Sequence, residues 1–386
     1  MIRPGWTTTA GWYGFFFLFG GAHLPFWPLW LADWGLSAAE IGTYTAAGVA
    51  ARVAFGVFLP WIADVVSAPR RVLASLCLIA SAIYFAHIWI ETRPLLLAAT
   101  IGASAALAGA LPIGDALALR AAERGPFTYA TARSVGSAAF LFANLACGLA
   151  VARYGSEAAI WWIALSLAPL IWLSWRHPGG AGAQIGGARL SEAARLLKAP
   201  AFIAALIASA ATMGSHAVIY AYGSIHWRAQ GIGDEVIGAL WAFGVAVEVV
   251  VMAVFGAAMI ARLGVAGSLM LGGAVGVVRW AAMTLDPSLF WLWPLQALHS
   301  LTFTATHLGL MAFIAAAAPV RLASTAQGLA SSLAGGVLMA GATALAALIY
   351  PIYGAGAFWL AAGLAALGVA AAVLLHLVWK GERLEV

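Results

Sequence analysis

Five charged side chains lie inside long apolar stretches of the sequence, where charge is costly: Arg52, Asp115, Arg133, Glu248 and Arg279. A charge at the centre of a bilayer costs at least about 2.5 to 3.5 kcal/mol, so such a group usually faces a cavity or a partner. Arginine binds carboxylates through a bidentate fork, and a carboxyl group in an apolar region can exchange a proton. These side chains therefore predict anion binding, proton transfer or both.

Asp115 lies in ALPIGDALALR and Arg133 in YATARSVGS, on neighbouring predicted helices. The two residues could form a buried ion pair that only locks the helices together. Alternatively, they could form a polar pair that lines a central path. The second interpretation is favoured because a purely structural pair could be replaced by apolar packing at little cost. We therefore expect Asp115 and Arg133 to contact substrate.

Glu248 lies in VAVEVVVMAV, with no other charge within a helical turn. Burial disfavours the ionised form of a carboxyl group, which makes Glu248 a candidate proton carrier. The alternative is a salt bridge to Arg279 or Arg52 that only fixes helix positions. Three internal arginines against two internal carboxylates leave a surplus positive charge, which an anionic substrate could neutralise.

Polar and aromatic residues extend this set. His299 shares a helix face with Thr302 and Thr306, and we expect His299 to line the path. His23 and Trp27 lie in GAHLPFWPLWLADW, where two prolines should kink or loosen a predicted helix. Freed backbone is tolerated best where it lines a cavity, so His23 and Trp27 join the predicted substrate site.

The elements that position these residues are membrane-spanning helices. Of the 386 residues 64% are hydrophobic and 9% charged, against roughly a quarter charged in an ordinary soluble domain. Each apolar run is about 20 residues or longer and can cross a bilayer as a helix. The predicted runs lie near residues 10–32, 39–62, 71–90, 94–119, 128–152, 157–175, 200–226, 235–260, 265–284, 288–317, 322–350 and 355–379.

The basic residues predict the orientation of these twelve spans. One side receives Arg93, Arg153 and Arg228, and the other receives all the remaining Lys and Arg outside the spans. By the positive-inside rule both termini are expected in the cytoplasm, with the chain in a bacterial inner membrane. Cys77 and Cys147 are expected to be small apolar residues.

An internal repeat divides the chain. At a constant offset of 196, GLSAAEIGTYTAAGVAARV from Gly35 matches GIGDEVIGALWAFGVAVEV from Gly231. Weaker matches are GAH with GSH and TAR with TAQ. The predicted domains are residues 1–176 and 200–386, two pseudo-symmetric six-helix bundles joined by a cytoplasmic linker at 177–199. This all-α membrane architecture is that of a major facilitator transporter.

No motif indicates an enzyme or a cofactor. The Gly-rich stretch GGAGAQIGG lacks the GK[ST] ending of a Walker loop, and no nucleophile or metal cluster stands out. We expect no cofactor, no metal and no nucleic-acid partner, and transport driven by a gradient.

Several blocks resemble a known family: GAHLPFWPLWLADWGLSAAEIG, GDALA, YATARSVGS, IHWRAQG, VAVEVV, GVVRW and ALHSLTFTATHLGLMAFIA. Together they resemble the phenylpropionate permeases of the major facilitator superfamily, over nearly the whole chain. The resemblance implies proton-coupled import of an aromatic carboxylate such as 3-phenylpropionate by a monomer. Symport of a sugar, nucleoside or other neutral solute is the alternative, and a ligand sensor that does not transport is a further one.

The chain is also similar, at fewer positions, to the lactose-permease-type proton symporters. That resemblance implies substrate binding by Asp115 and Arg133, and it matches their span-nine arginine and the following histidine to Arg279 and His299. Thr302 stands where those symporters carry their proton-accepting glutamate. The resemblance therefore implies that coupling has moved to Glu248, Asp115 or His299, with Arg279 beside them.

Overall fold

Helix α2 (Ala38–Val65) shows how local sequence sets the helix boundaries in this computed structural model. The Ser37 side chain accepts a hydrogen bond from the backbone of Glu40, and the Glu40 side chain accepts one from the backbone of Ser37. This capping box satisfies backbone donors that the first helical turn leaves free. The structure describes residues 5–180, 195–319, 322–332 and 336–384, and these residues form helices and connections without a β-strand.

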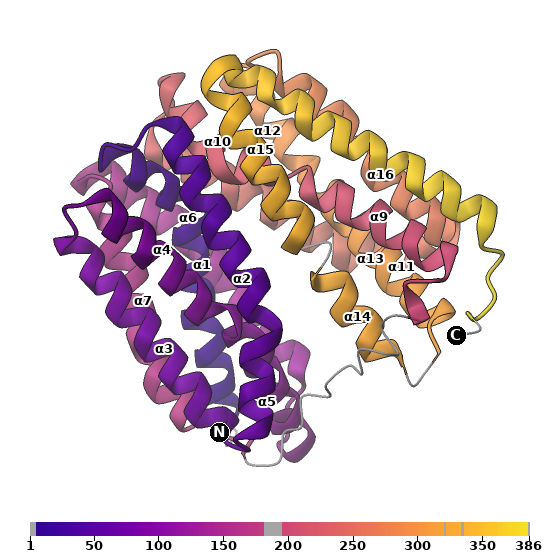
Figure 1. Ribbon diagram of the computed structural model, residues 1–386, viewed down its shortest axis with the longest axis horizontal. Coiled ribbons are helices and arrows are strands. Elements are labelled where there is room, and N and C mark those ends of the chain that lie inside the picture. Colours follow the sequence, from indigo (N-terminus) through magenta and orange to yellow (C-terminus); the bar gives the residue numbers. More distant parts are fainter. Residues whose placement is uncertain (1–4, 181–194, 320–321, 333–335, 385–386) are drawn as a thin grey trace. The chain divides into compact units, whose positions relative to one another are not determined.

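The helices of the first half are α1 (Trp6–Asp33), α2, α3 (Pro69–Ala86), α4 (Arg93–Ala108), α5 (Ala110–Arg124), α6 (Tyr129–Tyr154) and α7 (Glu157–Trp175). Those of the second half are α9 (Pro200–Gly214), α10 (Ala217–Ala229), α11 (Asp234–Met283), α12 (Leu289–Ala297), α13 (His299–Ala317), α14 (Ala323–Ser332), α15 (Leu338–Tyr353) and α16 (Phe358–Val378). Figure 1 labels these helices.

The predicted spans are confirmed. Ten described segments are long and apolar enough to cross a membrane. Asp234–Met283, at 50 residues, holds two predicted runs that meet at Gly264, whose φ of 66° breaks the helix. The 41-residue segment Leu338–Val378 holds α15 and α16, which belong to different predicted runs. When each of these two long segments is counted as two spans, the ten described segments correspond to twelve spans.

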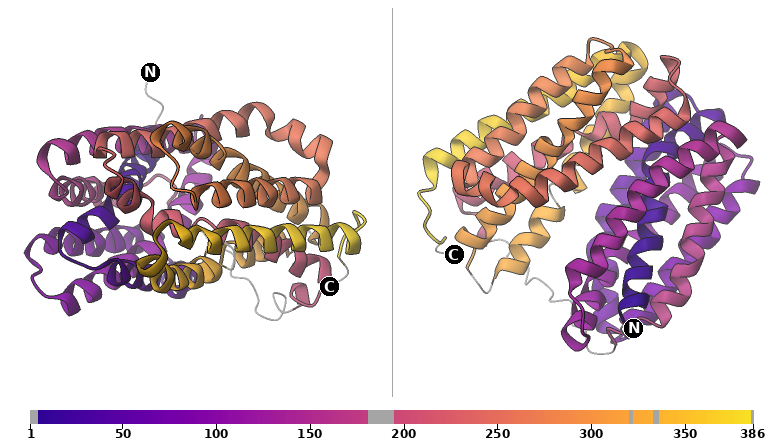
Figure 2. Two further views of the ribbon diagram at one scale, coloured as in Figure 1. Left: turned by 90° about the horizontal axis from the view of Figure 1, so that it is seen from above. Right: turned by 180° about the vertical axis from the view of Figure 1, so that it is seen from behind.

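The described chain divides into two units. Unit 1 takes the residues up to 180 together with Trp227–Ala242, and unit 2 takes 195–226 and the residues from Phe243 on. In unit 1, α1 packs against α6 and α7, and α2 packs against α4. In unit 2, α9 packs against α13 and against α16, which is yellow in Figure 2. The predicted linker lies mostly outside the described residues, so the domain boundaries stay a prediction.

The sequence repeat has a counterpart in backbone geometry. Gly35 and Gly231, 196 positions apart, both have a positive φ, at 100° and 83°. The residue after each glycine donates a backbone hydrogen bond five positions back, Leu36 to Leu31 and Ile232 to Trp227. This is the C-terminal cap in which glycine tolerates the left-handed conformation.

Candidate functional site

Asp115 of α5 is held by two tyrosines. The hydroxyl of Tyr13, a fully buried residue of α1, donates to Oδ1 of Asp115. The hydroxyl of Tyr129, at the start of α6, donates to the same oxygen over 3.1 Å. Two phenol donors on one oxygen anchor the carboxylate at the meeting point of three helices.

Arg133 of α6 lies against aromatic rings. Its guanidinium carbon is 4.0 Å from the centroid of the Phe17 ring and 5.4 Å from that of Tyr13. A Cβ at Gly136 would lie 2.7 Å from the Phe17 ring, so the absence of a side chain there lets Phe17 approach α6. Such cation–π contacts attract the guanidinium to the negative faces of the rings without satisfying its N–H groups by oxygen acceptors.

Asp115 and Arg133 do not form the direct ion pair that was one of the two interpretations of these residues. Arg133 makes no hydrogen bond or ion pair with any residue in the described ranges, although it is close enough to act electrostatically on Asp115. Tyr13 contacts both residues, the first with its hydroxyl and the second with its ring. The structure therefore replaces a direct pair with a contact through Tyr13.

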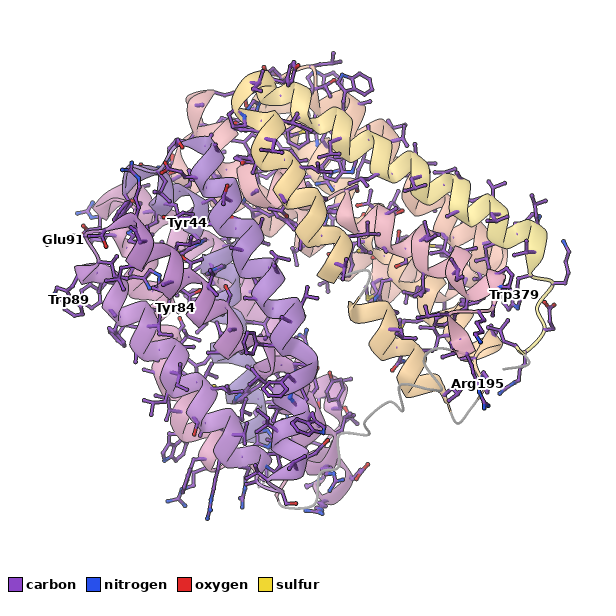
Figure 3. The ribbon with its side chains drawn as sticks, in the orientation of Figure 1. Tyr44, Tyr84, Trp89, Glu91, Arg195 and Trp379 are labelled. Atoms are coloured by element: carbon purple, nitrogen blue, oxygen red, sulfur yellow. The ribbon has the colours of Figure 1, made fainter. Side chains whose placement is uncertain are left out.

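His23 and Trp27 belong to an aromatic cluster along α1. The His23 ring stacks on Trp27 with centroids 5.3 Å apart, and Trp27 stacks on Trp30. Tyr84 of α3, labelled in Figure 3, meets His23 and Trp27 edge-on. Helix α1 continues through Pro25 and Pro28 without a break, so these prolines do not end the helix.

Arg52 of α2 lies near this aromatic cluster. It is close enough to His23 and Tyr84 for electrostatic interaction. Within the part of the chain that the structure describes, its guanidinium has no hydrogen-bond or ion-pair partner. Unit 1 thus carries two intramembrane arginines, each beside aromatic rings and neither paired with a carboxylate.

In unit 2 the predicted residues are joined. Oε2 of Glu248 is 3.0 Å from Nε2 of His299, and Nη1 of Arg279 is 3.4 Å from Nδ1 of the same ring. Arg279 is 2% exposed and donates to Oε1 of Gln296 over 2.7 Å. Glu248 therefore pairs with His299, and the His299 ring lies between Arg279 and Glu248.

The donor pattern fixes the protonation of His299 in this arrangement. A guanidinium can only donate, so Nδ1 of His299 must accept from Arg279. The ring proton then lies on Nε2 and is donated to Glu248. His299 is therefore neutral in the row of contacts from Arg279 through His299 to Glu248. Glu248, at the end of this row, is the group that can accept a proton.

Thr302 is buried and hydrogen-bonded to a second histidine. Its Oγ1 donates to the carbonyl of His299 over 3.0 Å and lies 3.1 Å from Nε2 of His216. His216 lies at the junction of α9 and α10, and its Nδ1 is 3.2 Å from the carbonyls of Thr212 and Met213. His216 thus connects the break in one span to the helix that carries His299.

The comparisons with known proteins agree with this architecture. Residues 6–361 match the MFS_1 like family. The chain belongs to this family. It is 30% identical over 363 residues to the probable 3-phenylpropionic acid transporter of Escherichia coli (strain K12), covering 91% of this chain and 93% of that protein. It is 24% identical over 291 residues to the uncharacterized transporter YwbF of Bacillus subtilis (strain 168), covering 75% and 72%.

Solved structures show that this MFS_1 like protein has the major facilitator fold. The nucleoside transporter NupG matches with a TM-score of 0.78 at 14% identity, over 98% of this chain and 99% of that one. A D-xylose-proton symporter matches with a TM-score of 0.66 at 13% identity, over 97% of each chain. The protein is a transporter of the major facilitator type.

Sequence reasoning missed three residues of this transporter's polar clusters, Tyr13, Tyr129 and Gln296, and it placed His216 at membrane depth without assigning it to a site. Tyrosine is common in membrane helices, and the contact between Tyr13 and Asp115 spans 102 positions. His216 had a weak signal, because the GSH that contains it matches the GAH that contains His23.

Proposed function

We propose that this transporter is a proton symporter that imports a small aromatic carboxylate such as 3-phenylpropionate by alternating access. It acts as a monomer in a bacterial inner membrane, with both termini in the cytoplasm. The observation that carries the proposal is Arg133, a half-buried guanidinium that lies beside Phe17 and Tyr13 and has no hydrogen-bond or ion-pair partner among the described residues.

The chemistry of unit 1 supports an aromatic anion as the substrate. An arginine holds a carboxylate through two parallel hydrogen bonds, and aromatic faces bind a phenyl ring by offset or edge-on stacking. A second arginine near aromatic residues is Arg52 of α2, which is close to Tyr84 and to His23, ten residues along α1 from Tyr13. The name of the Escherichia coli relative agrees with this substrate class.

Unit 2 supports the proton step. Glu248 ends a chain in which the Nη atoms of Arg279 keep their contacts with His299 and Gln296 whether or not Glu248 carries a proton. A carboxyl group in that position can load and release a proton during the transport cycle without exposing another buried charge. A monoanion that enters with one proton moves no net charge. Each further proton adds about 2.3 kcal/mol per 100 mV.

Uptake into proteoliposomes tests the proposal. Purified protein should accumulate labelled 3-phenylpropionate when the outside is acid, and the neutral analogue 3-phenylpropionamide should compete poorly because Arg133 needs a carboxylate. Arg133→Gln should lose binding of the acid and keep its thermal stability.

The rival functions predict different results in the same assay. Accumulation of glucose or uridine with no effect of 3-phenylpropionate would replace this proposal with symport of a neutral solute. Binding of the acid without accumulation under any gradient would instead favour a sensor that does not transport.

A further inference from the structure

Two opposite charges lie near each other in unit 1 without touching. Asp115 and Arg133 interact electrostatically, yet each makes its close contacts with aromatic residues. In surroundings of low dielectric, a guanidinium and a carboxylate with freedom to move would form a short bidentate pair. Something must therefore hold the two apart.

Tyr13 is the residue in contact with both. Its hydroxyl donates to Oδ1 of Asp115, and its ring lies under the guanidinium of Arg133. Tyr13 is fully buried, and its ring also meets Tyr129 edge-on, so its position is fixed by packing. Tyr129 adds a second donor to the same Oδ1, but among the described residues the rings that lie against the Arg133 guanidinium are those of Phe17 and Tyr13.

We infer that Tyr13 is a positioning residue that keeps Asp115 off Arg133, so that the N–H edge of Arg133 stays available for the carboxylate of the substrate. The inference rests on the proposed function, which names that substrate class. It assigns to Tyr13 the carboxylate specificity of the site, because without Tyr13 the protein's own carboxylate would occupy Arg133.

Removing the hydroxyl separates this role from direct binding. In Tyr13→Phe, Asp115 loses one of its two donors and can swing to pair with Arg133. Affinity for 3-phenylpropionate should then fall about tenfold or more, the effect of losing a charge-assisted contact. In Tyr13→Phe/Asp115→Asn the carboxylate that would capture Arg133 is gone, and affinity should rise to that of the single variant Asp115→Asn, well above that of Tyr13→Phe.

Titration calorimetry on the full-length protein measures these affinities, with Tyr129→Phe as the matched control. Tyr129→Phe removes a phenol donor from the same oxygen but leaves Tyr13 in place, so its affinity should stay close to that of the parent. Failure of Asp115→Asn to restore binding in the Tyr13→Phe background would overturn the inference, as would parent-like binding by Tyr13→Phe.

A second measurement needs no ligand and keeps the inference distinct from the proposed function. The melting-temperature shifts of Asp115→Asn and Arg133→Gln should be only weakly coupled in the parent, where the two side chains interact through space and through Tyr13 but do not touch. In the Tyr13→Phe background they should not add, because the pair has formed. If the parent binds no aromatic carboxylate, the proposed function fails, while this cycle still decides whether Tyr13 separates the charges.

Discussion

The charged side chains of unit 1 are held apart, whereas those of unit 2 are joined. In unit 1, Asp115 takes its hydrogen bonds from tyrosines, and Arg133 lies over aromatic rings. In unit 2, the guanidinium of Arg279 reaches Glu248 through the ring of His299. The two units share a fold and a repeat, so the difference lies in which side chains occupy comparable helices.

This difference indicates separate tasks for the two units. An intramembrane guanidinium without an anion partner is costly, and binding an anionic substrate would offset that cost. Both Nη atoms of Arg279 have partners in unit 2, although its buried Nε has none among the described residues, and the chain of contacts ends in a carboxyl group that can change its protonation. We therefore expect Arg133 and Arg52 to bind the carboxylate of the substrate and Glu248 to carry the proton.

The largest expected effect separates Glu248 from Asp115. Glu248→Gln should lower accumulation driven by a pH gradient by about a hundredfold or more, the scale on which removing a proton-transferring group acts. Exchange of internal for external substrate should continue without a gradient, since it needs no net proton movement. Asp115→Asn should retain the pH dependence of uptake, because the two phenols already satisfy Asp115.

Proteoliposomes loaded with labelled 3-phenylpropionate measure both uptake and exchange for these variants. Loss of gradient-driven uptake in Asp115→Asn together with its retention in Glu248→Gln would reverse the assignment of the two units.

A smaller effect concerns stability. Arg279→Leu should lower the free energy of unfolding by about 3 to 5 kcal/mol, because it removes one partner from a buried polar chain. Arg52→Leu should change it by about 0.5 kcal/mol or less, because Arg52 has no partner to leave behind among the described residues. Thermal unfolding of the purified variants measures the contrast, and equal losses would contradict the difference between the units.

The spans and the charged residues could be predicted from the sequence. A long apolar run outside the membrane and a charge inside an apolar helix are both strongly unfavourable. A long apolar run has few alternatives to a membrane helix, and a charge such as Glu248 or Arg279 inside one stands out. The same reasoning found His299, whose contacts with Glu248 and Arg279 confirm that these residues lie together. Their roles in substrate and proton binding stay predictions.

The partners of these residues could not be predicted, because a contact depends on side-chain geometry across helices. Asp115 and Arg133 lie on neighbouring helices, which indicated proximity, but the spacing carried no information on Tyr13, which contacts both. Thr302 was identified as a departure from the symporter pattern. Its hydrogen-bond partner His216 lies 86 positions away, and only the weak GSH match pointed to it.

The smallest expected effect tests how far the repeat extends into packing. At an offset of 196, a Cβ on Gly48 would lie 2.8 Å from Oγ of Ser104, and one on Gly244 would lie 3.2 Å from the carbonyl oxygen of Gln296. In both units a glycine lets the second helix of the repeat approach the fourth closely. Alanine at either position should cost about 1 to 3 kcal/mol of stability through overpacking.

The two alanine variants should differ in how they are rescued. Ser104→Ala removes the hydroxyl that a Cβ at residue 48 would meet, so it should restore the melting temperature of Gly48→Ala. The obstacle at Gly244 is a backbone carbonyl, which no side-chain change can remove. Gly244→Ala should also slow uptake, because its Cβ would lie 3.2 Å from the carbonyl oxygen of Gln296, and a shift of Gln296 would disturb the hydrogen bond that its side chain accepts from Arg279. If Ser104→Ala rescued Gly48→Ala and Gly244→Ala equally, the contact of the added Cβ with the facing helix would not be the cause of either loss of stability.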